Sequence, residues 1–142
     1  MKLSPHISLA FNGQCEAAFR FYEKSLNGTL AFMLTWGESP AAAEAPPGWD
    51  AKIYHATLKI GDTVIYGSDM PPDRYSPPKG FSIVLEMDDP AAAERMFRAL
   101  AEEGRIEMPL QETFWAVRFG ALVDRFGIVW SVNCEKAAEP AQ

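Results

Sequence analysis

Apolar and polar residues alternate from residue 7 to residue 12, with the two-residue period of a half-buried β-strand. Between residues 14 and 26 the apolar positions recur at helical spacing instead, and Gly28 stands where a left-handed helix cap is expected. The apolar helix positions are Cys15, Ala18, Phe19, Tyr22 and Leu26. Residues 30–36 again have the composition of a strand, so the chain begins with a strand, a helix and a strand.

Two proline-rich stretches frame the next predicted elements. Residues 38–50 show no amphipathic period and are interpreted as a loop. Residues 53–60 and 63–68 alternate as strands on either side of a Gly-Asp turn, which predicts a hairpin. The second proline-rich stretch, residues 70–80, is the natural linker to the second half of the chain.

The second half repeats the order of the first. A strand at 81–87 leads to Asp89, a good N-cap, and Pro90, suited to the first helical position. The helix is expected to end at Gly104, and three further strands are expected at 105–110, 114–123 and 128–133.

The repeat predicts one α+β domain, residues 1–142, built from two tandem βαβββ modules. The first module covers 1–69 and the second 81–135, joined by the linker 70–80, and 136–142 are expected to be a disordered tail. Each amphipathic helix covers one face of its sheet, so the other face is free to line a groove. Two such sheets facing each other would enclose a cup. The less apolar sides of the strands carry His6, Ser8, Asn12, Tyr66, Ser68, Ser82, Glu86, Ser131 and Asn133.

Charge and composition exclude several classes of protein. The 142 residues carry a formal net charge of -6, which does not suit a protein that tracks nucleic acid or an anionic membrane. The N-terminus lacks the apolar core of a signal peptide, and no apolar run reaches the roughly 18 residues of a membrane span. With only two cysteines and no zinc spacing, a reducing cytoplasm is the expected location.

Four stretches resemble the vicinal oxygen chelate superfamily of glyoxalases, extradiol dioxygenases and bleomycin or fosfomycin resistance proteins, and within it the PhnB-like branch. They are FNGQCEAAFRFYEKSLNG, HATLKIGDTVIYGSDMPP, GFSIVLEMDDPAAAERMFRALAEEG and MPLQETFWAVRFGALVDRFGIVWSVNCE. They occur in the family's order and cover nearly the whole chain. The resemblance implies paired βαβββ modules that form a cup-shaped antiparallel sheet, a ligand site in the cup and, commonly, a homodimer.

The resemblance also indicates where a divalent metal would bind. The metal enzymes of the superfamily use His and Glu ligands at positions that fall at or near His6, Tyr66, Ser82 and Ser131 in this sequence. Only His6 is a good ligand, because neutral hydroxyls and a phenol supply little charge to a divalent cation. We therefore expect no tightly bound metal and no other cofactor.

His55 and Tyr66 are the candidate catalytic residues, since His55 lies in mid-strand beside a loop and an imidazole can serve as a base or a ligand. A purely structural histidine is the alternative. The candidate ligand-binding residues are His6, Ser68, Ser82, Glu86, Trp115, Arg118 and Ser131. Alternation places Trp115 and Arg118 on opposite faces of one strand, and the other interpretation of Arg118 is an ion pair with Asp124 or Glu112.

Two further residues have simple structural interpretations. Asp124 precedes the final strand and is expected to accept hydrogen bonds from backbone amides of a turn. Cys15 lies in the first helical turn, where a thiol can be activated, but it also lies on the apolar stripe, which favours a buried and inert thiol.

These residues are compatible with three functions. The first is binding of a small organic ligand in the cup, as a homodimer and without a tightly held metal. The second is a metal-dependent lyase or dioxygenase with a non-standard site formed by His55, Tyr66 and Glu86. The third is drug sequestration, for which the -6 charge and three tryptophans suit cationic aromatic molecules. Those tryptophans are Trp36, Trp49 and Trp115.

Overall fold

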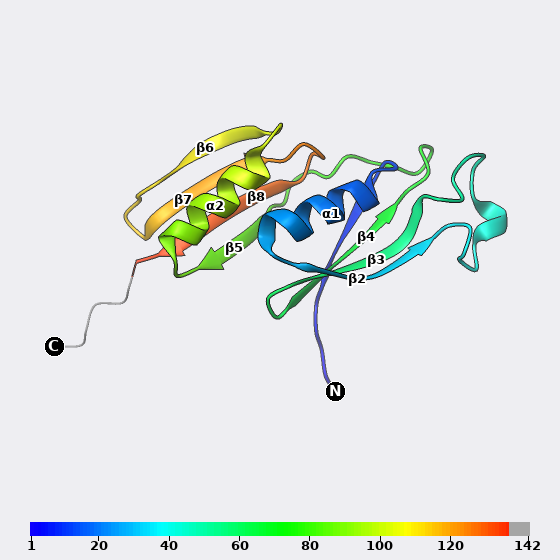
Figure 1. Ribbon diagram of the computed structural model, residues 1–142, viewed down its shortest axis with the longest axis horizontal. Coiled ribbons are helices and arrows are strands. Elements are labelled where there is room, and N and C mark those ends of the chain that lie inside the picture. The colour runs from blue at the N-terminus through cyan, green and yellow to red at the C-terminus, as the bar shows by residue number, and fades with distance from the viewer. Residues whose placement is uncertain (137–142) are drawn as a thin grey trace. The chain divides into compact units, whose positions relative to one another are not determined.

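The structure is a computed structural model that describes residues 1–136 (Figure 1). The elements are β1 (Ile7–Phe11), α1 (Cys15–Leu26), β2 (Thr29–Thr35), a 3-10 turn (Ala42–Glu44), β3 (Ile53–Ile60), β4 (Thr63–Asp69), β5 (Ile83–Met87), α2 (Pro90–Ala101), β6 (Arg105–Gln111), β7 (Ala116–Val123) and β8 (Val129–Glu135). Over this part of the chain, no helix is long and apolar enough to cross a bilayer.

The chain divides into two compact units, Met1–Pro78 and Lys79–Gln142. The division falls inside the proline-rich segment 70–80. The predicted tail lies outside the described residues, apart from Lys136.

The first unit is a four-stranded sheet with one helix on it. The strand order is β1-β4-β3-β2, in which β1 runs parallel to β4 and the other pairs are antiparallel. Helix α1 packs on one side of this sheet and buries its predicted apolar positions (Figure 1). The phenyl ring of Phe19 lies against Gly67 of β4, where a Cβ atom would come within 2.5 Å of the ring.

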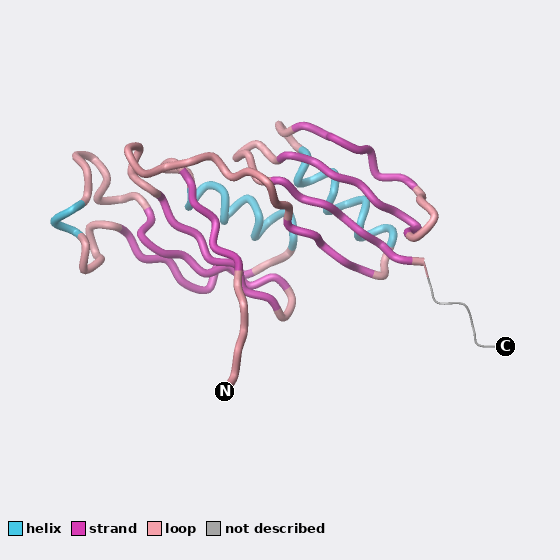
Figure 2. The backbone as a smooth tube through the Cα atoms, turned by 180° about the vertical axis from the view of Figure 1, so that it is seen from behind, coloured by secondary structure: helices cyan, strands magenta, loops and turns pink. Residues whose placement is uncertain are grey.

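The second unit repeats this arrangement. Its strand order is β5-β8-β7-β6, again with one parallel pair, β5 and β8, and helix α2 covers one side. Figure 2 shows the two sheets from behind, with the helix of each unit on the far side of its own strands. The predicted α+β fold of two βαβββ modules is confirmed. Each sheet is mixed and not purely antiparallel as predicted, because the first strand of each unit pairs parallel to its last strand, β1 to β4 and β5 to β8.

The start of α2 agrees with the sequence prediction, whereas the end of α1 differs from it. Asp89 caps α2 as predicted, with its side chain accepting a hydrogen bond from the backbone of Ala91 at 3.0 Å. The left-handed residue after α1 is Asn27, with φ of 54°, and not Gly28. Gly28 serves another purpose: a Cβ atom there would lie 2.7 Å from the carbonyl oxygen of Lys59.

A buried carboxylate, Asp69, joins three parts of the first unit. One of its oxygens accepts a hydrogen bond from the backbone N–H of Cys15 at 2.9 Å, and the other from that of Ile53 at 2.8 Å. Its backbone carbonyl accepts a bond from the indole of Trp36 at 3.1 Å. The end of β4 is thereby tied to the start of α1, to the start of β3 and to the loop after β2.

Asp124 has a similar role in the second unit, as the sequence predicts. Its carboxylate accepts hydrogen bonds from the backbone N–H groups of Phe126 and Ile128, at 2.8 and 3.0 Å, and from the indole of Trp130 at 2.8 Å. The predicted turn role is confirmed, and the same side chain also holds a core tryptophan.

Replacing Asp69 is expected to destabilise the protein. Asp69→Ala leaves two buried backbone N–H groups without acceptors, which should lower the free energy of unfolding by about 2 to 4 kcal/mol. Asp69→Asn keeps one acceptor oxygen and should lower the free energy of unfolding by less. The exposed Asp73→Ala is the control, with an expected change within about 0.5 kcal/mol. Urea unfolding followed by circular dichroism measures all three, and equal effects of Asp69→Ala and Asp73→Ala would contradict the role of Asp69.

Candidate functional site

Each sheet has one helix-covered face and one that its own helix leaves uncovered, which we call its open face. In the first unit, position 67 faces Phe19 and Cys15 of α1. Side chains alternate along a strand, so Tyr66 and Ser68 point to the open face. The register places Ser8, Thr57 and Phe32 in the same cross-strand row as Tyr66.

Four rings form a continuous row across the first open face, which we call the aromatic row. The ring centres of His6 and Tyr66 are 5.3 Å apart, and those of His55 and Tyr66 are 5.2 Å apart. Phe32 extends the row, with its ring centre 6.1 Å from that of His55. The structure thus brings His6, His55 and Tyr66 together, and it places Ser68 on the same face. Phe32, which sequence reasoning missed, is 50% exposed there.

The two imidazoles of the aromatic row have only weak polar partners. His6 Nε2 lies 3.3 Å from the hydroxyl of Ser4, and His55 Nε2 lies 3.4 Å from that of Thr57. Within residues 1–136 neither imidazole pairs with a carboxylate. The row is therefore an aromatic surface with hydrogen-bonding nitrogens along it, suited to stacking on a planar molecule.

The open face of the second unit is identified in the same way. Position 120 faces Phe97 of α2, so Phe119 points to the open face. On one side, Phe119 is paired with Asn133 of β8, which is paired in turn with Glu86 of β5. On the other side, Phe119 is paired with Gln111 of β6. We call these four residues the Asn133 row.

Asn133 is the unusual member of its row. The residue is only 7% exposed, and its Oδ1 atom is buried with no hydrogen-bond partner among the described residues. Ser131 lies on the same face, two residues earlier on β8, beside Val84 and Ala121. Ser82 precedes β5 and is exposed. Strand alternation in the sequence predicts Asn133 on this side of the strand but assigns it no role.

Aromatic side chains continue from the Asn133 row towards the start of β7. The ring centre of Trp115 is 5.3 Å from that of Phe119 and 4.7 Å from that of Phe114. Trp115 is 42% exposed, so its ring is available to a ligand.

Arg118 does not join the other candidate ligand-binding residues. Its Nε atom lies 3.3 Å from a carboxylate oxygen of Glu94 on α2, and another guanidinium nitrogen donates to the carbonyl of Val117 at 2.8 Å. Arg118 therefore lies on the helix-covered face. The alternative of an ion pair agrees with the structure, but the partner is Glu94 instead of Asp124, which binds Trp130, or Glu112, which pairs with Lys136.

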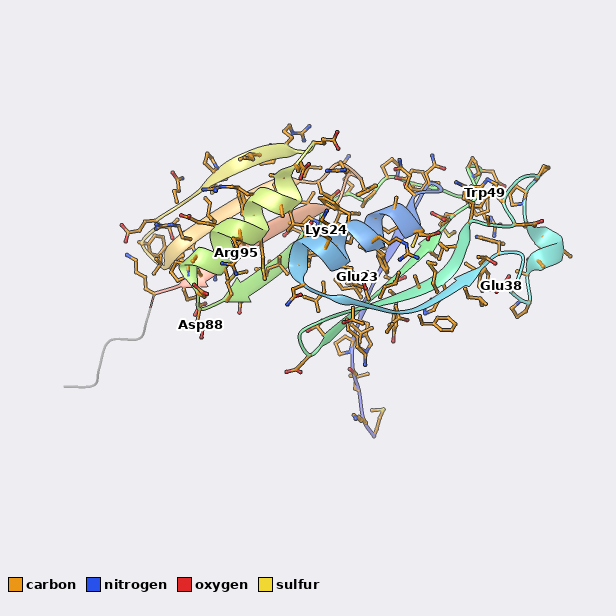
Figure 3. All side chains as sticks on the ribbon, viewed as in Figure 1. Glu23, Lys24, Glu38, Trp49, Asp88 and Arg95 are labelled. Carbon is orange, nitrogen blue, oxygen red and sulfur yellow. The ribbon has the colours of Figure 1, made fainter. Side chains whose placement is uncertain are left out.

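A recess lies at the carboxyl ends of the parallel strands β5 and β8, with a volume of about 560 Å³. Its lining residues are Glu86, Met87, Asp88, Glu135 and Lys136. Figure 3 labels Asp88, at the point where β5 leads into α2. Three carboxylates against one ammonium make this acidic recess attractive to positive charge.

Cys15 has the environment of an inert thiol. The residue is fully buried, and burial, together with the nearby carboxylates of Asp69 and Glu16, raises the pKa of its thiol well above the ordinary value. A helix N-terminus normally lowers a thiol pKa, but here the first backbone N–H donates to Asp69. Burial thus opposes a nucleophilic role.

Two units of identical topology, each with ligand-type side chains on the open face, define a paired βαβββ-module protein. Residues 4–132 match the Glyoxalase/Bleomycin resistance protein/Dioxygenase superfamily, and the chain belongs to it. The predicted superfamily is confirmed.

Individual relatives span nearly the whole chain. Protein YjdN from Escherichia coli (strain K12) is 37% identical over 100% of both chains. The crystal structure of protein PA1353 from Pseudomonas aeruginosa is 47% identical, has a TM-score of 0.87 and covers 96% of this chain and 100% of its own. A PhnB protein from Bacillus cereus, 22% identical with a TM-score of 0.78, covers 93% and 99% and shows the same fold.

The residues at the superfamily's metal-ligand positions do not fit a divalent cation. His6 has the phenol of Tyr66 as its neighbour, and Ser131 is flanked by Val84 and Ala121. Among residues 1–136 there is no cluster of three or more His, Cys, Asp or Glu side chains that could hold a metal ion. One imidazole with neutral hydroxyls supplies too little charge and too few donors.

Both thiols are expected to be unreactive in the folded protein. Cys15 and Cys134 are buried, and the raised pKa of Cys15 keeps it protonated even at mildly alkaline pH. Ellman's reagent should therefore label neither thiol in native protein and both in urea. Rapid labelling of one thiol in native protein, lost in Cys15→Ala, would contradict the structural role of Cys15.

Proposed function

We propose that this protein binds a small organic molecule with a planar ring on the open sheet faces, as a homodimer and without a tightly held metal. The observation that carries the proposal is the aromatic row, His6, Tyr66, His55 and Phe32, on a sheet face that α1 leaves uncovered. Ring-on-ring contacts contribute about 0.5 to 1.5 kcal/mol each beyond buried area.

The polar groups along the row support binding in a defined orientation. Ligand sites are mostly apolar, with a few polar groups that fix how the ligand lies. The hydroxyls of Ser4 and Thr57 beside the two imidazoles provide such groups, and each can donate or accept. The half-exposed ring of Phe32 supplies apolar surface at the β2 end of the row.

A homodimer is the proposed assembly, as the resemblance implies. The edge strands are β1 and β2 in the sheet of the first unit and β5 and β6 in that of the second. Exposed apolar residues lie beside the Asn133 row, Phe114 and Trp115 among them. Apolar surface of this kind is suited to contact with a second copy or with a ligand. Sedimentation equilibrium measures the assembly directly.

The two histidines allow a sharp test of ligand binding, because the chain has only two and both lie in the aromatic row. Titration with catechol or indole should shift the imidazole Cε1–H proton resonances of both histidines in a saturable manner. Tyr66→Ala removes the ring between them and should weaken binding by up to about tenfold, the value of one ring-on-ring contact with the ligand.

Tyr54→Ala is the matched control for this titration. Tyr54 precedes His55 on β3, so it points away from the aromatic row, and its ring contacts Trp36. This variant should bind the probes as the natural protein does. Unshifted histidine signals with both probes, or equal losses in the two variants, would contradict the proposal.

Metal binding is expected to be weak. Isothermal titration with Zn²⁺, Ni²⁺, Mn²⁺ or Fe²⁺ should show no stoichiometric binding in the micromolar range, because the donor set has one imidazole at the four family positions. Micromolar, one-to-one binding that disappears in His6→Ala would overturn the metal-free proposal and would favour a metal-dependent lyase or dioxygenase.

A further inference from the structure

The side chain of Asn133 lacks the partners that a buried amide normally has. Its Oδ1 atom is buried, and the described residues provide it with no hydrogen bond. Buried polar atoms are nearly always paired, because an unpaired one costs free energy in the folded state. Rotation about the last side-chain bond exchanges the amide oxygen and nitrogen without altering the packing of the residue. The same rotation lets the amide oxygen take the place of the nitrogen.

The surroundings of Asn133 favour a ligand that donates hydrogen bonds. Glu86 is its direct register neighbour on β5, and Glu135 lies two residues later on β8, on the same face. Both carboxylates line the acidic recess, together with Asp88. Ionised carboxylates only accept hydrogen bonds, so these groups and the Asn133 oxygen call for N–H donors and positive charge.

The other side of Asn133 is aromatic. Phe119 is its register neighbour on β7, and the ring of Trp115 lies 5.3 Å from that of Phe119. A planar cation can stack on such rings while its N–H groups reach the acceptors beside them. Lys136 also lines the recess, and its ammonium lies 3.6 Å from a carboxylate oxygen of Glu112, so it does not balance the three carboxylates there.

We propose that the Asn133 row and the acidic recess bind an aromatic cation with N–H donors, of the arylamidine class. The N–H groups bond to Asn133 and Glu86, and the ring lies against Phe119 and Trp115. This inference rests on the proposed function and names the class of ligand on the second open face.

Three probes of one shape separate charge from hydrogen bonding. Benzamidine is a planar cation with N–H donors, benzamide keeps donors without the charge, and benzoate is an anion without donors. Calorimetry should rank their affinities in that order, and added salt should weaken benzamidine binding. Benzoate binding as tightly as benzamidine would overturn the inference.

Two variants locate the site. Asn133→Leu removes the amide at similar volume and should weaken benzamidine binding about tenfold or more, the value of one hydrogen bond to a charged group. Glu86→Gln keeps the shape of the side chain and should weaken benzamidine binding several-fold. Glu44→Gln, an exposed change in the first unit that alters net charge equally, is the control and should leave affinity unchanged.

Asn133→Leu also has an expected effect on the free protein. Removing an unpaired buried amide should raise the melting temperature, and a lowered one would show that the amide has a structural role. Benzamidine binding that neither Asn133→Leu nor Glu86→Gln weakens would overturn the inference. So would the absence of benzamidine binding at millimolar concentration. The catechol and indole titration of the two histidines then decides separately whether the broader proposal stands.

Discussion

One helix per four-stranded sheet is the constraint on which the rest of this structure depends. A 12-residue helix covers one face of a sheet and cannot cover both. Strand alternation then divides the side chains of each strand between a core and an open face. In both units the helix side carries the apolar core, and the other side carries imidazole, phenol, amide and carboxylate groups. The ligand-type residues lie together because the core residues between them face α1 or α2.

The sequence predicted what depends on local period and missed what depends on long-range contact. The alternation on 53–60 and 63–68 placed Tyr66 and Ser68 on the open face, and the helical stripe identified the buried side of α1. Asp69 could not be recognised, because its partners Cys15 and Ile53 are far away in the chain. The partner of Arg118 was missed for the same reason, since Glu94 lies on a helix that packs against β7.

The superfamily fold is retained here with different chemistry on its open faces. At the positions where related enzymes hold a metal, this chain has residues of the aromatic row in the first unit and Ser131, between apolar neighbours, in the second. The remaining polar groups include the amide of Asn133, whose buried oxygen has no hydrogen-bond partner among the described residues. Such surfaces recognise an organic molecule by stacking and hydrogen bonding.

We propose that the open faces, and not the helices or loops, bind the ligand. Intermolecular nuclear Overhauser effects between bound indole and the protein test it most directly. We expect contacts from indole to the rings of His6, Tyr66 and Phe32, and none to exposed residues of the helices such as Arg20 or Arg95. Contacts confined to the helix surfaces, with none to the aromatic row, would contradict it.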